Sequence, residues 1–218
     1  MCKSSTFKSY DVATNFLQQS DAILGKLISA VGSCQLKASS ESDLISAIAK
    51  GIISQQISTL AASAIYKRFV QLYVDYDSTE EKAKAILETP DERLREAGIS
   101  RPKIRYLKDL AEKSLSDLPT LEELETKNDE EIIQILTQIK GVGRWTAQML
   151  LMFSLNRQDV LPVDDLGVRK AIKNLYALKE MPTRVSVEEL GKKWKPYRSI
   201  ACWYLWKSLE HSQESCWD

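Results

Sequence analysis

The chain contains few of the residues on which metal and redox sites depend. Its 218 residues include one histidine and four cysteines. The histidine, His211, lies near a polar C-terminus, so we expect neither a histidine metal site nor a histidine-based catalytic triad. The cysteines are widely separated and form no Cys-x-x-Cys pair, which excludes a disulfide framework, a zinc site and a four-cysteine iron–sulfur cluster. They are typical of reduced thiols in an intracellular protein.

A long apolar run, a signal sequence and a net charge are also missing. Basic and acidic residues number 30 each, so the total charge gives no sign of nucleic-acid binding. The charges are nevertheless uneven, with an acidic segment at 117–131 and a mostly basic one at 169–198, so a basic face can be hidden. We expect a monomer inside the cell, in the nucleus if the source is a eukaryote, with no membrane partner.

No segment shows the alternating pattern of a β-strand, and apolar residues recur instead with helical spacing. The sequence therefore predicts an all-α fold of roughly ten helices. Residues 1–10 and 210–218 are polar and are expected to be flexible tails. Residues 11–209 are long enough for one sizeable core or two small lobes, and we expect them to form a single domain.

Two glycines, Gly141 and Gly143, separate two apolar helical runs. The first run follows a capping box, with Asn128 as the cap and Glu131 three residues later. Glycines this close together end one helix and let another restart. The restart presents backbone N–H groups and the positive end of a helix dipole, which favours a bound phosphate. An ordinary corner between two helices explains the glycines at least as well.

A polar segment, residues 54–59, separates two other apolar helices. Gln55 and Gln56 are poor core residues, but glutamine side chains pair well with base edges in a groove. Ile57 follows them and is suited to wedging between bases. The alternative is a solvated turn between helices.

A pair of acids, Asp164 and Asp165, follows a segment that Pro162 keeps extended. Both precede a helix that carries Val168, so either aspartate can serve as its N-cap. Capping alone would account for one of the two.

Four stretches lie in the same order as in a known family: residues 51–58, 139–147, 160–169 and 196–206. The third contains Pro162-Val163-Asp164-Asp165, and the last begins Pro196-Tyr197-Arg198-Ser199. On these stretches the chain resembles the helix–hairpin–helix DNA glycosylases, specifically the alkylation-repair branch of AlkA-like and yeast Mag-type 3-methyladenine glycosylases. A Gly-x-Gly hairpin alone is a weak signal, whereas the hairpin, Pro-x-Asp-Asp and terminal helix in this order are specific.

The resemblance implies two helical lobes with the DNA and active-site cleft between them. Lobe one would span about residues 50–160, and lobe two residues 11–49 plus 161–209. The hairpin would hold a phosphate beside the lesion, with an optional Na⁺ or K⁺ ion on backbone carbonyls near Ile139 and Val142 and no required cofactor. The DNA-binding residues implied in and beside the hairpin are Lys140, Gly141, Val142, Gly143, Arg144 and Thr146.

In this family the aspartate that opens the helix after Pro-x-Asp-Asp is catalytic, and it corresponds to Asp165. Cleavage of the N-glycosidic bond to a cationic alkylated base builds positive charge on the sugar, which a buried carboxylate stabilises, or the carboxylate orients a water. Bifunctional relatives carry a strand-cutting lysine at the position of Trp145, so the resemblance implies a monofunctional enzyme. It also places Trp145 and Ser54 at the base pocket, where the ring would stack on a flipped base; core packing is the alternative for the tryptophan.

The polar segment corresponds to the family's wedge loop, which implies DNA contacts by Gln55, Gln56, Ile57 and Ser58. Yeast-type relatives often have a histidine where this chain has Ser58, and serine loses a donor and shortens the reach. We predict a base-excision-repair glycosylase that flips alkylated purines, of the 3-methyladenine and 7-methylguanine type, out of double-stranded DNA and hydrolyses their glycosidic bond. The alternative is a non-catalytic or weakly catalytic homologue that binds abasic or distorted DNA.

Overall fold

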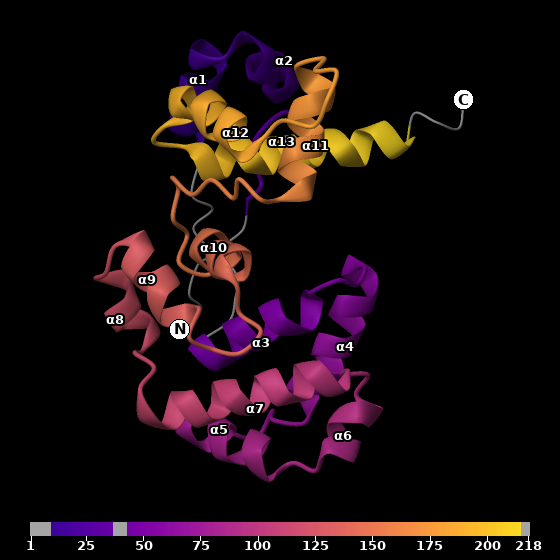
Figure 1. The fold of residues 1–218 in the computed structure, drawn as a ribbon, viewed down its shortest axis with the longest axis vertical. Coiled ribbons are helices and arrows are strands. Elements are labelled where there is room, and N and C mark those ends of the chain that lie inside the picture. Colours follow the sequence, from indigo (N-terminus) through magenta and orange to yellow (C-terminus); the bar gives the residue numbers. More distant parts are fainter. Residues whose placement is uncertain (1–9, 37–42, 215–218) are drawn as a thin grey trace, which may run out of the picture. The chain divides into compact units, whose positions relative to one another are not determined.

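The computed structural model describes residues 10–36 and 43–214, with side chains described as far as residue 210. Within these ranges the chain forms thirteen α-helices, one short 3₁₀ helix and no strand, which confirms the all-α fold (Figure 1). It divides into two compact units, residues 1–37 with 157–218 (unit 1) and residues 38–156 (unit 2). Among the helices described, none is long and apolar enough to cross a membrane.

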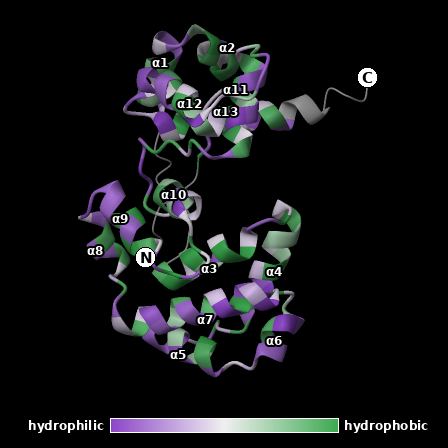
Figure 2. Ribbon diagram, in the orientation of Figure 1, coloured by the Kyte–Doolittle hydropathy of each residue, from purple (hydrophilic) through white to green (hydrophobic). Residues whose placement is uncertain are grey.

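Unit 2 is organised around one apolar helix. Its helices are α3 (Leu44–Ser54), α4 (Thr59–Gln71), α5 (Thr79–Glu88), α6 (Asp91–Glu96), α7 (Arg101–Ser116), α8 (Leu121–Glu125), α9 (Asp129–Leu136) and α10 (Arg144–Phe153). Helix α3 contacts α4, α5, α7 and α10, and Figure 2 shows how apolar its sequence is. Most of α3 is buried in unit 2, so the packing of this helix fixes the position at which residues 55–58 begin.

Local capping explains where several of these helices start. The predicted capping box is present, since the Asn128 side chain accepts from the Glu131 amide and the Glu131 carboxylate accepts from the Asn128 amide. The same reciprocal arrangement starts α5 at Ser78 and α8 at Thr120. Such boxes satisfy backbone donors that the first helical turn leaves without partners.

Unit 1 is organised around the C-terminal helix. It comprises α1 (Asp11–Ser20), α2 (Ala22–Val31), α11 (Leu166–Leu175), α12 (Arg184–Gly191), the 3₁₀ helix η1 (Lys192–Trp194) and α13 (Arg198–Glu214). Helix α13 contacts α1, α2 and α11. Among its described side chains, five apolar ones are buried: Ile200, Ala201, Cys202, Tyr204 and Leu205.

A buried carboxylate, that of Asp21, joins the elements of unit 1. One oxygen caps α2 by accepting from Leu24 N at 3.2 Å. The other accepts from the Tyr176 hydroxyl, from Trp194 Nε1 at 2.9 Å and from Lys193 Nζ at 2.9 Å. Burial alone would raise the pKa of Asp21, but the hydrogen bonds from these partners lower the pKa to about 2. The carboxylate is therefore ionised and satisfied inside the unit.

The structure differs from the sequence-based boundaries in three places. Tyr10, expected in the flexible tail, is buried next to the start of α1, while residues 1–9 lie outside the described ranges. Helix α13 continues to Glu214, five residues into the expected tail at 210–218, and residues 215–218 are likewise outside. The expected lobe boundary at 49/50 falls inside α3, whose packing places residues 44–49 in unit 2.

Candidate functional site

The glycine hairpin, residues 137–143, connects α9 to α10 in unit 2. Gly141 has φ of +81°, a backbone conformation that favours glycine. A Cβ at this position would also lie 2.2 Å from Cδ2 of the Tyr106 ring, so no larger residue fits. Ile139 and Val142 are buried and anchor the turn in the core. The hairpin is thus a fixed turn and not a loose connection.

Gly143 is different, because the fold does not require a glycine there. Its φ of −89° is accessible to any residue, and a Cβ would meet nothing within 4 Å. It is the N-cap of α10, and no side chain caps that helix. Because Gly143 has no side chain and the start of α10 is uncapped, another molecule can approach the backbone N–H groups closely. An anion would be favoured there by the helix dipole.

Both cationic residues expected to bind DNA at the hairpin are paired with acids. Lys140 Nζ lies 2.9 Å from Oδ1 of Asp109. The Arg144 guanidinium donates to both oxygens of Glu130, at 2.9 and 2.7 Å. The Lys140 and Arg144 side chains are 71% and 53% exposed, so both are accessible to a phosphate.

The wedge loop, residues 54–58, lies between α3 and α4. Gln56 adopts a left-handed conformation with φ of +58°, and Ile57 is 39% exposed. Ser58 is the N-cap of α4, and its hydroxyl accepts from Ala61 N at 3.3 Å. The hydroxyl of Ser54 is turned to its own helix, where it donates to Lys50 O. Gln56 and Ile57 are both exposed and so are accessible to another molecule.

The side chain of Gln55 has a role that sequence reasoning missed. Its Nε2 donates to Gly141 O at 2.8 Å and to Thr146 Oγ1 at 3.1 Å. The amide group expected on a base edge is therefore bound to the hairpin, 86 residues away. Thr146 is buried, with its hydroxyl on Gln55. The structure brings the wedge loop and the hairpin into direct contact.

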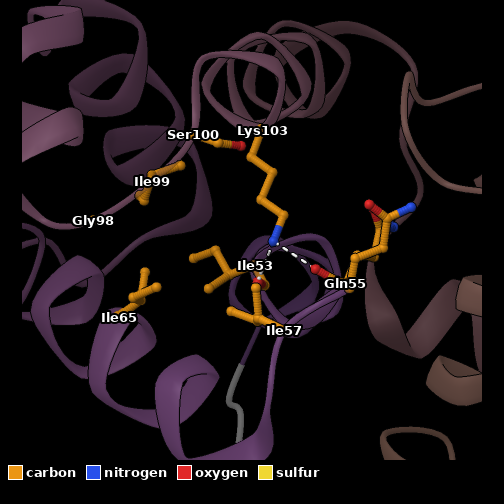
Figure 3. A pocket seen from close by; sticks show the side chains of 9 residues that line it. Ile53, Gln55, Ile57, Ile65, Gly98, Ile99, Ser100 and Lys103 are labelled. Atoms are coloured by element: carbon orange, nitrogen blue, oxygen red, sulfur yellow. Dashed lines mark hydrogen bonds between the residues drawn. The ribbon is translucent and has the colours of Figure 1, made fainter.

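Beneath the wedge loop lies a mainly apolar hollow of about 210 Å³, walled by α3, α4 and the start of α7. Figure 3 shows the Lys103 side chain entering it from α7, with Ile53, Ile57 and Ile65 around it. Lys103 Nζ donates to the carbonyl oxygens of Ile53 and Gln55, both at 2.7 Å. The ammonium group thus occupies the C-terminal end of α3, where the helix dipole favours a cation.

The expected catalytic carboxylate lies in unit 1, at the start of α11. Asp165 is 9% exposed, and its Oδ1 accepts from Val168 N at 2.7 Å and from Trp206 Nε1 at 2.9 Å. It is therefore the N-cap of α11, the structural role foreseen for one of the two acids. Gly167 leaves room for this arrangement, since a Cβ there would lie 3.0 Å from both Asp165 Oδ1 and Trp206 Cδ1. The Trp206 contact was not foreseen.

The start of α13 fixes the segment that leads to this aspartate. The Ser199 hydroxyl accepts from Val160 N at 3.0 Å and donates to Arg157 O at 2.7 Å. Arg198 binds both carboxylate oxygens of Asp159, at 2.6 and 2.9 Å. These contacts give the Arg-Ser part of the terminal motif a physical function, which is to align residues 157–160 on α13.

Two other titratable groups lie close to Asp165: the thiol of Cys202 and the carboxylate of Asp164. Cys202 is fully buried, and burial, together with the negative charge of Asp165, raises the pKa of its thiol. The thiol is therefore protonated and unreactive at neutral pH. Asp164 is half-exposed and pairs with Arg184. In the part of the chain that the structure describes, no group of three or more His, Cys, Asp or Glu side chains forms a metal site.

Trp145, at the start of α10, is 40% exposed and so is not a core residue.

Sequence reasoning did not identify one exposed apolar side chain near the wedge loop. Leu60, in the first turn of α4, is 83% exposed. Its only sequence signal is a leucine directly after a capped helix start, which does not distinguish a solvent-exposed leucine from a buried one.

Comparisons with known proteins agree on one family. The family model described as HhH-GPD superfamily base excision DNA repair protein matches residues 49–196. DNA-3-methyladenine glycosylase 1 of Schizosaccharomyces pombe is 43% identical over 162 residues, which cover 73% of this chain and 69% of that protein. The alkylbase DNA glycosidase-like protein mag2 of the same organism is 36% identical over 208 residues, covering 95% and 96%.

A solved structure gives the same result. The S. pombe 3-methyladenine DNA glycosylase Mag1 in complex with abasic DNA superimposes with a TM-score of 0.82 at 38% sequence identity. The match covers 91% of this chain and 96% of the other. The family resemblance inferred from the sequence is confirmed.

Proposed function

This chain belongs to the HhH-GPD superfamily of base excision DNA repair proteins, and we propose that it hydrolyses the glycosidic bond of alkylated purines in double-stranded DNA. The proposed substrates are of the 3-methyladenine and 7-methylguanine type. The observation that carries the proposal is the buried carboxylate of Asp165, held by Val168 N and Trp206 Nε1. Relatives named 3-methyladenine glycosylases support the substrate class.

The geometry of Asp165 suits stabilisation of a cation. An alkylated base leaves as a neutral molecule, so its departure needs no strong acid, and positive charge builds on the sugar. A carboxylate fixed by two donors at one oxygen cannot rotate away and keeps its charge directed at one place. Low solvent exposure strengthens that charge–charge attraction. Asp165 would act on the sugar directly or by orienting the attacking water.

The hairpin would hold the DNA backbone. The open space at Gly143 and the uncapped start of α10 suit a phosphate. Lys140 and Arg144 are close in sequence, and their side chains are accessible. A Na⁺ or K⁺ ion would be bound by backbone carbonyl oxygens near Ile139 and Val142, which are ligands that suit a hard cation. The Ile139 carbonyl accepts one hydrogen bond, from Val142 N at 3.0 Å, which leaves its second lone pair for an ion.

The wedge loop and Trp145 complete the proposed lesion contacts. Gln56 and Ile57 would fill the gap left by the flipped base, and Trp145, with Ser54, would lie at the base pocket. Trp145 carries no amine, so the abasic product would stay uncut. We also propose a single domain at residues 11–209 that acts as a monomer inside the cell, in the nucleus if the source is a eukaryote.

A second function, binding of abasic or distorted DNA with little or no excision, has its own support. The hydroxyl of Ser58 is used to cap α4. This position therefore presents a weaker hydrogen-bond donor to the DNA than the histidine of many yeast-type relatives does. The relative that matches nearly the whole chain is named only glycosidase-like. Both functions share the hairpin and the wedge loop and differ in the turnover at Asp165.

The deciding experiment measures bases released from methylated DNA by the wild type and by Asp165→Asn. Asparagine keeps an oxygen that can accept both hydrogen bonds and removes the negative charge. We expect the wild type to release 3-methyladenine and the variant to do so about 100-fold more slowly, the size typical of a lost electrostatic stabiliser. Equal release by both would refute the catalytic role. Tight abasic-DNA binding without release by either would establish the second function.

A further inference from the structure

Two side chains of α7 hold the two loops that face the DNA in the proposed function. Lys103 binds the backbone of the wedge loop, and Asp109 binds the backbone of the hairpin. The two residues are six positions apart, which is about 9 Å along the axis of an α-helix. A rigid helix that grips both loops fixes the distance between them.

Lys103 closes the end of α3. Its ammonium donates to Ile53 O and Gln55 O, carbonyls at the end of a helix that lack intrahelical partners (Figure 3). Burial lowers the pKa of this lysine, but the paired carbonyl oxygens favour its charged form. Without the ammonium, both carbonyls would lose a strong donor, and the start of the wedge loop would no longer be bound to α7.

Asp109 does the same for the hairpin. It is only 4% exposed, and its Oδ2 accepts from Lys140 N at 2.8 Å. Burial would raise the pKa of Asp109, but hydrogen bonds from the Lys140 backbone, from the Lys140 side chain and from Lys113 hold it below its ordinary value. An ionised, buried carboxylate on a backbone amide is a strong attachment.

Gln55 joins the two attachments. Its own carbonyl is held by Lys103, while its side chain donates to Gly141 O and Thr146 Oγ1. The contacts therefore form a closed circuit from α7 through Lys103 and Gln55 to the hairpin, and back through Asp109 to α7. We call these residues, Lys103, Gln55 and Asp109, the register ring.

We propose that the register ring is a positioning device that fixes the wedge relative to the phosphate-binding hairpin. The proposal rests on the function proposed above, because it assigns to the ring a part in lesion recognition. With the ring intact, insertion of the wedge and capture of the phosphate occur together, at one fixed spacing. With the ring broken, each loop still binds DNA, but the preference for a lesion over intact duplex falls.

The test compares Lys103→Met with Lys108→Met. Methionine keeps an unbranched side chain and removes the ammonium in both cases. Lys108 lies on the same helix, and its ammonium pairs with the exposed Asp91 at 2.7 Å, so the control loses the same charge without touching either loop. Binding is measured on two duplexes, one intact and one with a tetrahydrofuran abasic analogue beside 2-aminopurine, whose fluorescence reports wedge insertion.

We expect Lys103→Met to lower the ratio of abasic to intact affinity about tenfold, the size of losing hydrogen bonds to a charged donor, and to reduce the 2-aminopurine signal. Lys108→Met should change both affinities alike and leave the signal unchanged. Lys103→Arg, which keeps a cation, should restore part of the ratio. Equal ratios for the two methionine variants would overturn the proposal. If the wild type itself shows no abasic preference, the lesion recognition assigned to the two loops in the proposed function fails, whatever the base-release assay shows.

A measurement without DNA tests the ring independently of that outcome. In the free protein, amide hydrogen exchange of residues 54–58 and 137–143 should quicken in Lys103→Met and not in Lys108→Met, although only the first segment touches Lys103. Unchanged exchange in the hairpin would refute the link. If Lys103→Met melts too low for these assays, Gln55→Met breaks the same circuit at its middle, with Gln71→Met on the surface of α4 as its control, and the same two outcomes apply.

Discussion

Replacing each hairpin glycine by alanine should have a different effect: Gly141→Ala should lower stability, and Gly143→Ala should lower DNA affinity. Gly141→Ala places a side chain at φ of +81°, which costs about 1–2 kcal/mol. The new Cβ would also lie 2.2 Å from the Tyr106 ring, and relieving such an overlap costs about 1–3 kcal/mol more. We expect a loss of about 2–5 kcal/mol in the free energy of unfolding, from these two costs together.

Gly143→Ala is the matched change, two residues away. Its backbone is ordinary and the space around its Cβ is open. Alanine is a poorer N-cap than glycine, but it also restricts the unfolded chain, and these effects of about 0.5–1 kcal/mol oppose each other. The free energy of unfolding should therefore stay close to that of the wild type.

Urea unfolding followed by tryptophan fluorescence measures the free energy of unfolding, and fluorescence anisotropy on an abasic duplex measures the affinity for DNA. Gly143→Ala should bind DNA about tenfold more weakly, because a methyl group stands where a phosphate would approach and one lost backbone–anion hydrogen bond is worth about 1.5 kcal/mol or more. A Gly141→Ala variant as stable as the wild type would contradict the strained turn, and a Gly143→Ala variant that binds abasic DNA normally would contradict a phosphate at the start of α10.

Three further predictions concern other parts of the chain. Asp21, with a folded pKa of about 2 against an ordinary 3.8, should contribute about 2 kcal/mol of stability above pH 4 that is lost as the pH falls toward 2, so acid unfolding of Asp21→Asn should lack this dependence. The wild type should leave alkali-labile abasic sites and form no borohydride-trapped adduct with DNA, because Trp145 has no amine; a trapped adduct would identify a lyase. Ser58→His should raise excision or abasic affinity while lowering the melting temperature, because the cap on Ala61 N is lost, and unchanged DNA binding would argue against a contact at this position.

Sequence reasoning succeeded where the cause of a structure is local. The capping box at Asn128 and the helix cap supplied by one of the two acids, Asp165, follow from residues within a few positions of each other. The helical spacing of apolar residues gave the all-α fold for the same reason. The family followed from motifs in a fixed order, which the comparisons confirmed.

It missed the contacts between side chains of distant segments. The contact of the Gln55 amide with Gly141 O was not foreseen, because nothing in the sequence shows that the two residues lie side by side. The contact of Trp206 with Asp165 spans 41 residues and depends on how α13 packs on α11. Such contacts are set by packing of whole helices, which the period of an apolar pattern does not specify. The roles of the expected DNA-binding residues remain predictions.

The ion pairs at the hairpin have a consequence for the salt dependence of binding. Lys140 and Arg144 are already neutralised by Asp109 and Glu130, so each exchanges one negative partner for another when a phosphate arrives. Binding still releases counterions from the DNA, but the acid that each side chain leaves takes up a cation in return, so the net release per contact is smaller than for an unpaired lysine. A chain of zero net charge that binds DNA through such exchanged pairs should keep its lesion preference over a wide range of ionic strength. Its discrimination would then depend on the shape of the bound site more than on the charge of the backbone.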